Sequence, residues 1–176
     1  DYRKGGCAAF DYDRYWSSSL IHAVAMQVLS SRTRAAPADE SYCLGLLCRV
    51  GELALATLYP DEYSDVLSLP GARDPVGLAE FERQAFAMTH AELSAAMLSD
   101  WGVPNVFIEP VFLHEKKRSE TFAGSSREAV LTRSLNLARL ISRVCLASDE
   151  DSETGLSELM DSAATLSFGA DEILDL

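Results

Sequence analysis

The spacing of apolar residues predicts helices along most of the chain. The first helix is expected over residues 13–31, with Asp11 or Asp13 as its N-cap. An apolar residue recurs at every fourth position of this segment, and we expect that stripe to be buried: Trp16, Leu20, Val24 and Val28. Residues 39–58 are apolar almost all round, which is typical of a helix in the middle of a bundle. Gly45 and Gly51 weaken such a helix, so we expect neighbouring helices to pack closely against both.

Capping residues and prolines predict the helices in the middle of the chain. Short helices are expected at residues 60–70, 77–87 and 105–115, with Pro110 in a first turn or at a kink. A capping box, Thr89 with Glu92, begins another helix. The buried stripe of that helix should contain Leu93, Met97 and Trp101.

A long helix is expected in the last third of the chain. Ser125 and Glu128 fit a second capping box, and the helix should continue to about residue 147. Its buried stripe should contain Leu131, Leu135, Ala138 and Ser142. No segment alternates with period two for long enough to form a strand, so the predicted fold is an all-α, multi-helix bundle.

Acidic residues are concentrated at the end of the chain. The 176 residues include 27 acidic and 15 basic ones, a net charge of −12, but residues 1–148 carry only −3. We therefore expect a helical domain over residues 1–148 and an acidic linker or tail over residues 149–176. The tail has a weak helical pattern at Leu156, Leu159, Met160, Ala163 and Leu166, and a further start at Ile173 and Leu174. The acidic balance also argues against a nucleic-acid partner, because such proteins neutralise phosphates with Lys and Arg.

Cysteine content and hydropathy indicate a cytoplasmic protein. Its four cysteines form no Cys-x-x-Cys pair, so we expect free thiols in a reducing compartment: Cys7, Cys43, Cys48 and Cys145. No unbroken apolar run approaches the roughly 20 residues that cross a bilayer, so no membrane partner is expected.

Common enzyme signatures are absent from the sequence. It has no Gly-rich phosphate loop, no Gly-x-Ser-x-Gly elbow and no His-Glu-x-x-His motif. Its histidines are His22, His90 and His114. We expect His22 at the surface, His90 in the first turn of its helix, and His114 half-buried at a helix end. A histidine at a helix end often interacts with the helix dipole without any catalytic role.

Several segments, taken in their order and spacing, resemble one family. Residues 15–20, Tyr-Trp-Ser-Ser-Ser-Leu, resemble the Phe/Tyr-Trp-x-His-Ser-Leu stretch of HDOD domains, which are relatives of the HD-type metal-dependent phosphohydrolases. Residues 45–53, Gly-Leu-Leu-Cys-Arg-Val-Gly-Glu-Leu, are similar to the Gly-Leu-Leu-His-Asp-Ile-Gly-Lys-Leu segment of that family. Residues 59–63, Tyr-Pro-Asp-Glu-Tyr, are similar to its Pro-x-x-Tyr turn.

The resemblance continues into the second half of the chain. Glu82, the Thr-His-Ala-Glu segment at 89–92 and the Trp-Gly-Val-Pro segment at 101–104 resemble the family's Glu-x5-7-His-Ala-Glu and Trp-x-Leu-Pro stretches. His114 and Glu115 stand where the family usually has His-His. The resemblance covers about residues 10–148 and implies an HD-like bundle. Because HDOD domains usually start with a further helical subdomain, we expect this chain to be the C-terminal part of one, with apolar surface exposed.

Departures from the family pattern decide the expected chemistry. The resemblance implies metal ligands from a first-helix His, a His-Asp pair and a later Asp, but the matching positions hold Ser18, Cys48 and Arg49. Arg49 has only hydrogen-bond donors and a positive charge, which repels a metal ion. We therefore expect no catalytic residue, no metal and no other cofactor. The expected remnant is a degenerate pocket built from Ser18, Cys48, Arg49, His90, Glu92 and His114.

The resemblance implies a non-catalytic regulatory domain of a bacterial signalling protein. Such a domain acts through contacts with other proteins or adjacent domains, of receiver or diguanylate-cyclase type. One alternative is an HD-type phosphohydrolase acting on nucleotides or cyclic dinucleotides. Another is a ligand-sensing pocket in which Arg49 holds a phosphate or carboxylate. The oligomeric state stays open.

Arg49 raises a separate question, because its helix is apolar on nearly every side. A buried cation needs a partner, and we expect a carboxylate of Glu52, Glu82 or Glu92. The alternative is that the stem of Arg49 crosses the helix surface and its head reaches solvent.

Overall fold

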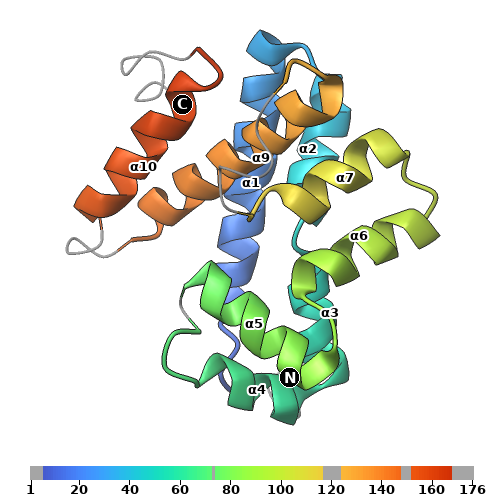
Figure 1. Ribbon diagram of the computed structural model, residues 1–176, viewed down its shortest axis with the longest axis vertical. Helices are drawn as coiled ribbons and strands as arrows, with labels where there is room; N and C mark the ends of the chain where they lie inside the picture. Colours follow the sequence, from blue (N-terminus) through green and yellow to red (C-terminus); the bar gives the residue numbers. More distant parts are fainter. Residues whose placement is uncertain (1–5, 73, 117–123, 148–151, 168–176) are drawn as a thin grey trace.

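The computed structural model describes residues 6–72, 74–116, 124–147 and 152–167. Within these ranges the chain forms helices and no strand, so the all-α prediction is confirmed (Figure 1). The helices are α1 (Tyr12–Thr33), α2 (Ala38–Leu47), α3 (Val50–Leu58), α4 (Pro60–Leu67), α5 (Pro75–Phe86), α6 (His90–Asp100), α7 (Asn105–Leu113), α9 (Arg127–Cys145) and α10 (Ser152–Ala164).

Polar side chains cap several helices as the sequence predicts. Asp11 accepts a hydrogen bond from the backbone of Arg14 at the start of α1, and Thr89 with Glu92 forms the capping box of α6. The second predicted box is wrong by one residue, because Ser126 is the N-cap of α9. Pro110 lies inside α7 and not in its first turn.

The apolar segment predicted as one helix over residues 39–58 is broken into α2 and α3. The break falls at Cys48 and Arg49, where Arg49 leaves helical geometry with φ −115° and ψ 19°. By length and composition alone, Ala38–Leu58 could cross a membrane, with a mean hydropathy of 1.3 in its best window. In the structure, 44% of that window is buried, and the two halves pack against α1 and α6. This is weak evidence for a membrane span, because a core helix passes the same test.

Gly45 and Gly51 lie where neighbouring backbones approach most closely. A Cβ added to Gly45 would come within 2.5 Å of the carbonyl oxygen of His22 in α1. A Cβ added to Gly51 would overlap the carbonyl oxygen of His90 in α6. The predicted close packing at both glycines is therefore confirmed.

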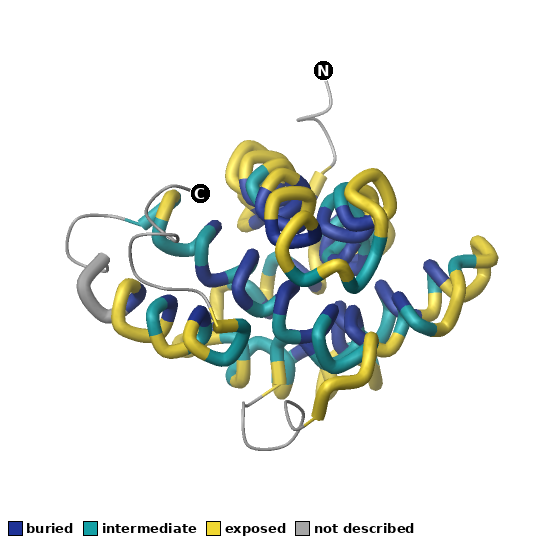
Figure 2. The backbone as a smooth tube through the Cα atoms, turned by 90° about the horizontal axis from the view of Figure 1, so that it is seen from above, coloured by how far each residue is buried: buried dark blue, intermediate teal, exposed yellow. Residues whose placement is uncertain are grey.

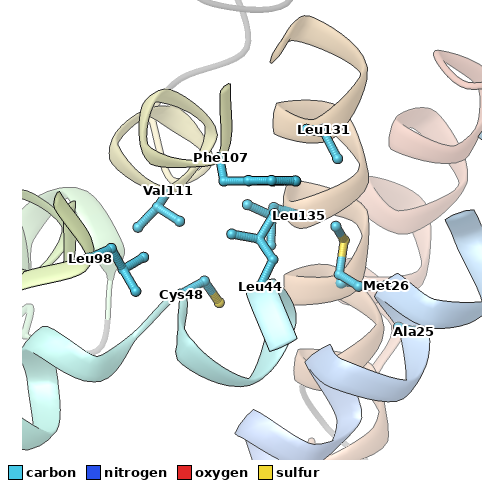
Figure 3. Packing of buried hydrophobic residues seen from close by; sticks show 10 residues of the cluster. Ala25, Met26, Leu44, Cys48, Leu98, Phe107, Val111, Leu131 and Leu135 are labelled. Atoms are coloured by element: carbon cyan, nitrogen blue, oxygen red, sulfur yellow. The ribbon is translucent and has the colours of Figure 1, made fainter. Parts of the chain in front are cut away.

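The main hydrophobic core lies where α1, α2, α6, α7 and α9 meet (Figure 3). Its buried members are Ala25, Met26, Leu44, Cys48, Leu98, Phe107, Val111, Leu131, Leu135 and Ala138. A second cluster around Tyr63 joins α1, α3 and α4. A third cluster around Leu29 and Leu137 receives Leu159 and Ala163 of α10. The helix predicted weakly in the acidic tail therefore exists and packs on the bundle, while its predicted continuation at Ile173 and Leu174 lies outside the described residues.

The division of the chain at residues 148 and 149 stays a prediction. Residues 148–151 are not among those described, and α10 beyond them contacts α9.

The stripe of α9 is buried as predicted, but the stripe of α1 is not. Leu131, Leu135, Ala138 and Ser142 are all at most 2% exposed. On α1 the predicted core residues are exposed by 38–51%: Trp16, Leu20, Val24 and Val28. The opposite face of α1 is buried and includes Ser18, Ser19, His22, Ala23 and Met26. The physical reason is the close approach of α2, since its Gly45 packs on the backbone of His22 and Ala23.

The predicted stripe of α6 is wrong at Trp101, whereas Leu93 is partly buried and packs against the second cluster. Trp101 is 55% exposed, and the buried positions are Ala91, Ser94, Ala95 and Leu98. Ser94 and the backbone of His90 contact Gly51, so this face carries small residues. Figure 2 shows buried positions on the inward sides of the helices and exposed positions on their outward sides.

Candidate functional site

A network of buried polar side chains lies at the break between α2 and α3. The guanidinium of Arg49 donates two hydrogen bonds to the carboxylate of Glu52, from Nε and Nη2, each 2.6 Å long. Its Nη1 donates to Ser18 Oγ at 2.6 Å, and the hydroxyl of Ser142 in α9 donates to the same oxygen at 2.9 Å. The predicted pairing of Arg49 with a carboxylate is confirmed, and its partner is Glu52.

His90 is the second centre of the network. Its Nδ1 donates to the carboxylate of Glu82 at 2.8 Å, and its Nε2 donates to Glu115 at 2.8 Å. Glu82 also accepts from the His90 backbone at 2.9 Å and from the hydroxyl of Tyr63 at 3.0 Å. Glu52 Oε1 lies 3.7 Å from His90 Nε2, so Glu52 connects the imidazole with Arg49.

The charges of this network stabilise one another. Burial by itself lowers the pKa of His90, but the charge of Glu115 and hydrogen bonds to Glu115 and Glu82 raise it well above its ordinary value. Burial by itself raises the pKa of Glu115, but His90 lowers it well below the ordinary value. Burial opposes the charge of Arg49 too, yet Glu52 raises its pKa. An ionised His90 between carboxylates follows from these shifts.

His22 and His114 are buried, neutral imidazoles beside the network. Each is 1% exposed, so the surface position predicted for His22 is wrong and His114 is more than half-buried. Each Nδ1 donates to a backbone carbonyl, of Ser18 at 2.7 Å and of Val111 at 2.8 Å. Burial lowers the pKa of His22 to about 3, with the charge of Arg49 acting in the same direction. Burial also lowers the pKa of His114.

Two of the predicted pocket residues lie outside this network. Cys48 is 1% exposed, its thiol donates to the Gly45 carbonyl at 3.2 Å, and it belongs to the main core. Glu92 caps α6 and pairs with Arg83 at 3.0 Å. The structure brings Ser18, Arg49 and His90 into one network, with His114 Nε2 at 3.7 Å from Glu115.

Four participants were not predicted as pocket residues. Glu52 and Glu82 were named as partners for Arg49, and Glu82 also as part of the family resemblance. Glu115 was named only as a departure from His-His, and Tyr63 only as part of a turn. The separation of Arg49 and Glu52 by three positions was an available signal, because such residues are neighbours on a helical turn. The contact of Glu82 with His90 depends on how α5 and α6 are joined, and the spacing of these two residues in the family resemblance was an available signal for it.

Comparison with known proteins identifies the family of the chain. The family model for the HDOD domain matches residues 2–117. The chain belongs to the HDOD domain family. No curated protein is significantly similar to the chain.

Solved structures agree with the HDOD assignment. The response regulator MmoQ from Methylococcus capsulatus is 35% identical, with a TM-score of 0.80, over 96% of this chain and 62% of that chain. A structure of the 20–298 fragment of MmoQ gives a TM-score of 0.75 at 35% identity, over 97% of this chain and 63% of that one. An HDOD domain protein from Geobacter sulfurreducens shares the fold at 18% identity, with a TM-score of 0.64, over 97% of this chain and 59% of that one. This HDOD chain therefore spans about three fifths of each.

The metal ions of the related HD enzymes do not fit the side chains as they are arranged in this HDOD domain. Glu52, His90 and Glu115 do offer ligand atoms within 4.8 Å of one another. However, both oxygens of Glu52 accept from Arg49, and both ring nitrogens of His90 lie 2.8 Å from carboxylate oxygens, whose charge favours the protonated imidazole. A metal ligand must present a lone pair, which a protonated imidazole lacks. Arg49 and His90 already supply the positive charge that these carboxylates require.

Proposed function

We propose that this HDOD domain is a non-catalytic signal-transduction module that acts through contacts with other proteins or adjacent domains. The observation that carries the proposal is the bidentate Arg49–Glu52 pair, which fills the centre of the polar network with a fixed cation. Metal-assisted hydrolysis needs an open coordination position for water or substrate. A guanidinium offers none.

Two further observations support a contact function. MmoQ, which is 35% identical, is a response regulator, and the expected partners of receiver or diguanylate-cyclase type belong to the same kind of signalling. The exposed stripe of α1 offers apolar surface for contact, because Trp16 and Leu20 each expose 51%. A bacterial, cytoplasmic setting is part of this proposal.

A second candidate function is an HD-type phosphohydrolase acting on nucleotides or cyclic dinucleotides. It is favoured by the convergence of Glu52, His90 and Glu115 within 4.8 Å. For this function, Arg49 would have to leave Glu52 and His90 would have to lose a proton.

Metal content and hydrolysis separate the two functions. The protein is purified without added metal, analysed for Mn, Fe, Zn and Mg, and assayed with each ion against nucleotides and cyclic dinucleotides. We expect far less than one ion per chain and no hydrolysis above that of a matched Glu115→Gln variant. One tightly bound ion per chain that is lost in Glu115→Gln, or hydrolysis lost in the same variant, would refute the proposal.

The contact function has its own test. A Trp16→Ser/Leu20→Ser double variant keeps the buried face of α1 intact, because both residues belong to the exposed stripe. In a pull-down with a receiver or diguanylate-cyclase domain from the same organism, we expect the wild type to retain the partner and the double variant to lose it. Equal retention by both proteins would show that α1 is not the contact surface.

A further inference from the structure

A cavity of about 310 Å³ is lined by residues of α9 and α10 and by Glu115. Its wall includes Lys116, Arg133, Arg139 and Arg143, four of the 15 basic residues of an otherwise acidic chain. α10 lies along α9 at this position (Figure 1). The cavity is separate from the apolar stripe of α1, whose residues do not line it.

Three of these four basic side chains interact with a neighbouring group of the protein. Arg143 pairs with Glu158 at 2.6 Å. Arg133 donates to the backbone carbonyl of Gly124 at 2.8 Å. The ammonium of Lys116 lies 3.8 Å from the centre of the Phe112 ring.

Arg139 differs from these three. Within the described parts of the chain its guanidinium makes no ion pair closer than 4 Å, and its Nε is buried. Burial lowers the pKa of Arg139, and the charge of Glu115 offsets this only in part. Arg139 is half-buried and lines the cavity, so an anion from solution can reach its guanidinium and offset the cost of its partial burial.

The carboxylates of the wall are mostly engaged elsewhere. Glu115 binds His90, Glu158 binds Arg143, and Asp74 caps α5 by accepting from the backbone of Gly77. Asp161 is exposed and makes no ion pair among the described residues. Among the residues that the structure describes, no direct ion pair neutralises the charge of the Arg139 guanidinium.

We propose that this cavity binds a small oxyanion, a phosphate or carboxylate group, on the guanidinium of Arg139. The planar fork of Arg suits two oxygens of one such group. The volume is at the lower end of the roughly 300–1,000 Å³ of small-molecule pockets, which suits a metabolite no larger than a mononucleotide. The earlier hypothesis that Arg49 holds such a group loses its support, since three donors of Arg49 are used by Glu52 and Ser18.

The cavity is connected to the Arg49–His90 network. Glu115 lines the cavity and accepts from His90 Nε2 at 2.8 Å, while Asn136 of the wall donates to the His114 carbonyl at 2.8 Å. An anion on Arg139 weakens the attraction of Arg139 for Glu115 and so changes the charge balance around His90. This inference deepens the proposed function, since the cavity becomes the input of a signalling domain.

Calorimetric titration tests the site with three probes: inorganic phosphate, a nucleoside monophosphate and succinate, each at constant ionic strength. We expect at least one probe to bind the wild-type protein. Arg139→Gln should weaken that binding about ten-fold or more, because a charge-assisted bidentate contact is lost. The matched control Arg83→Gln removes a cation from the surface of α5 and should bind as the wild type does. Which of the probes binds shows whether the site prefers a phosphate or a carboxylate group.

Three results would overturn the site: no binding of any probe, equal binding by Arg139→Gln, or equal loss in Arg83→Gln. If Arg139→Gln fails to fold, Arg139→Lys keeps the charge without the planar fork and should bind more weakly than the wild type. Binding should also shift the ring resonances of His90 in NMR spectra. A negative result for anion binding would not refute the proposed contact function. That function is tested separately by metal content, by hydrolysis and by the α1 variant.

Discussion

α1 and α9 carry similar apolar patterns and bury them in opposite ways. In α9 the stripe with Leu135 enters the core, and Leu135 is 0% exposed. In α1 the stripe with Leu20 faces outward, and Leu20 is 51% exposed. The inward face of α1 combines the apolar side chains of Met26 and Leu29 with hydroxyls and an imidazole. The two helices meet through the hydrogen bond from Ser142 to Ser18, at 2.9 Å, in the same network as Arg49.

The different burial of the α1 and α9 stripes shows that a repeat of apolar residues identifies only which side chains share a helix face. The neighbouring helix decides whether that face is covered. α2 approaches α1 on its small and polar side, because Gly45 allows backbone contact there. The apolar side of α1 is left as a surface for contact, whereas α9 is surrounded by α1, α7 and α10.

The largest expected effect concerns the network that joins the two helices. Arg49→Met leaves the carboxylate of Glu52 buried without its main partner and should lower the free energy of unfolding by about 3–5 kcal/mol. Urea denaturation at pH 7 measures this. The control Arg83→Met removes the exposed pair with Glu92 and should cost less than about 1 kcal/mol. A loss within about 0.5 kcal/mol for Arg49→Met would mean that the pair contributes no more than a surface residue.

The next effect compares one residue type on the two helices. Leu135→Ala creates a cavity in the core and should cost about 2–5 kcal/mol, whereas Leu20→Ala should stay within about 0.5 kcal/mol. Both variants can be measured in the same denaturation series. Equal costs would show that α1 and α9 bury their stripes alike.

A third prediction uses the buried imidazole of α1. The folded pKa of His22 is about 3 and the unfolded value about 6.5, so below pH 6.5 the unfolded chain binds a proton that the folded chain does not. The contribution of His22 is therefore fully present above pH 6.5 and is lost as the pH falls toward 3. At pH 5 the loss should reach about 2 kcal/mol.

His22→Gln removes this titration and is the matched comparison. The wild type should lose about 2 kcal/mol more than the variant between pH 7.5 and pH 5. Subtracting the two curves removes the titration of His90, which acts in the opposite direction because its pKa is raised. Parallel curves for the two proteins would place His22 in contact with solvent.

The smallest expected effect concerns the tryptophans. Both were predicted in the core, where replacement by Ala costs about 3–5 kcal/mol. Because Trp16 is 51% and Trp101 55% exposed, we now expect each replacement to cost less than about 1 kcal/mol. Acrylamide should quench the fluorescence of both indoles readily. Poor quenching would restore the original prediction.

Much of the fold could be predicted from the sequence because caps and prolines act locally. Asp11, Thr89 with Glu92, and the Pro60 that begins α4 all mark helix ends as expected. The break at Cys48 and Arg49 could not be predicted in this way. Neither residue is a Gly or Pro, and the break serves the contact of Arg49 with Ser18, which is 31 positions away.

The candidate site shows the same division. The pairing of Arg49 followed from burial of a charge, and Glu52 was one of three expected partners. The role of Glu115 and the burial of His22 depend on packing between helices that are far apart in sequence. The cavity beside Arg139 is formed in part by α10, and the weak pattern of that segment does not show where α10 packs.

The two glycine contacts determine how the bundle can deform. Side chains yield to a displacement by changing rotamer, but backbone atoms in contact do not. Gly45 therefore holds α2 in backbone contact with α1, and Gly51 holds α3 in backbone contact with α6. Any displacement between these two rigid pairs falls on Cys48 and Arg49, where α2 ends and α3 begins. Arg49 at this break also bonds to Ser18 of α1 and to Glu52 of α3, so a displacement between the two pairs would stretch these hydrogen bonds.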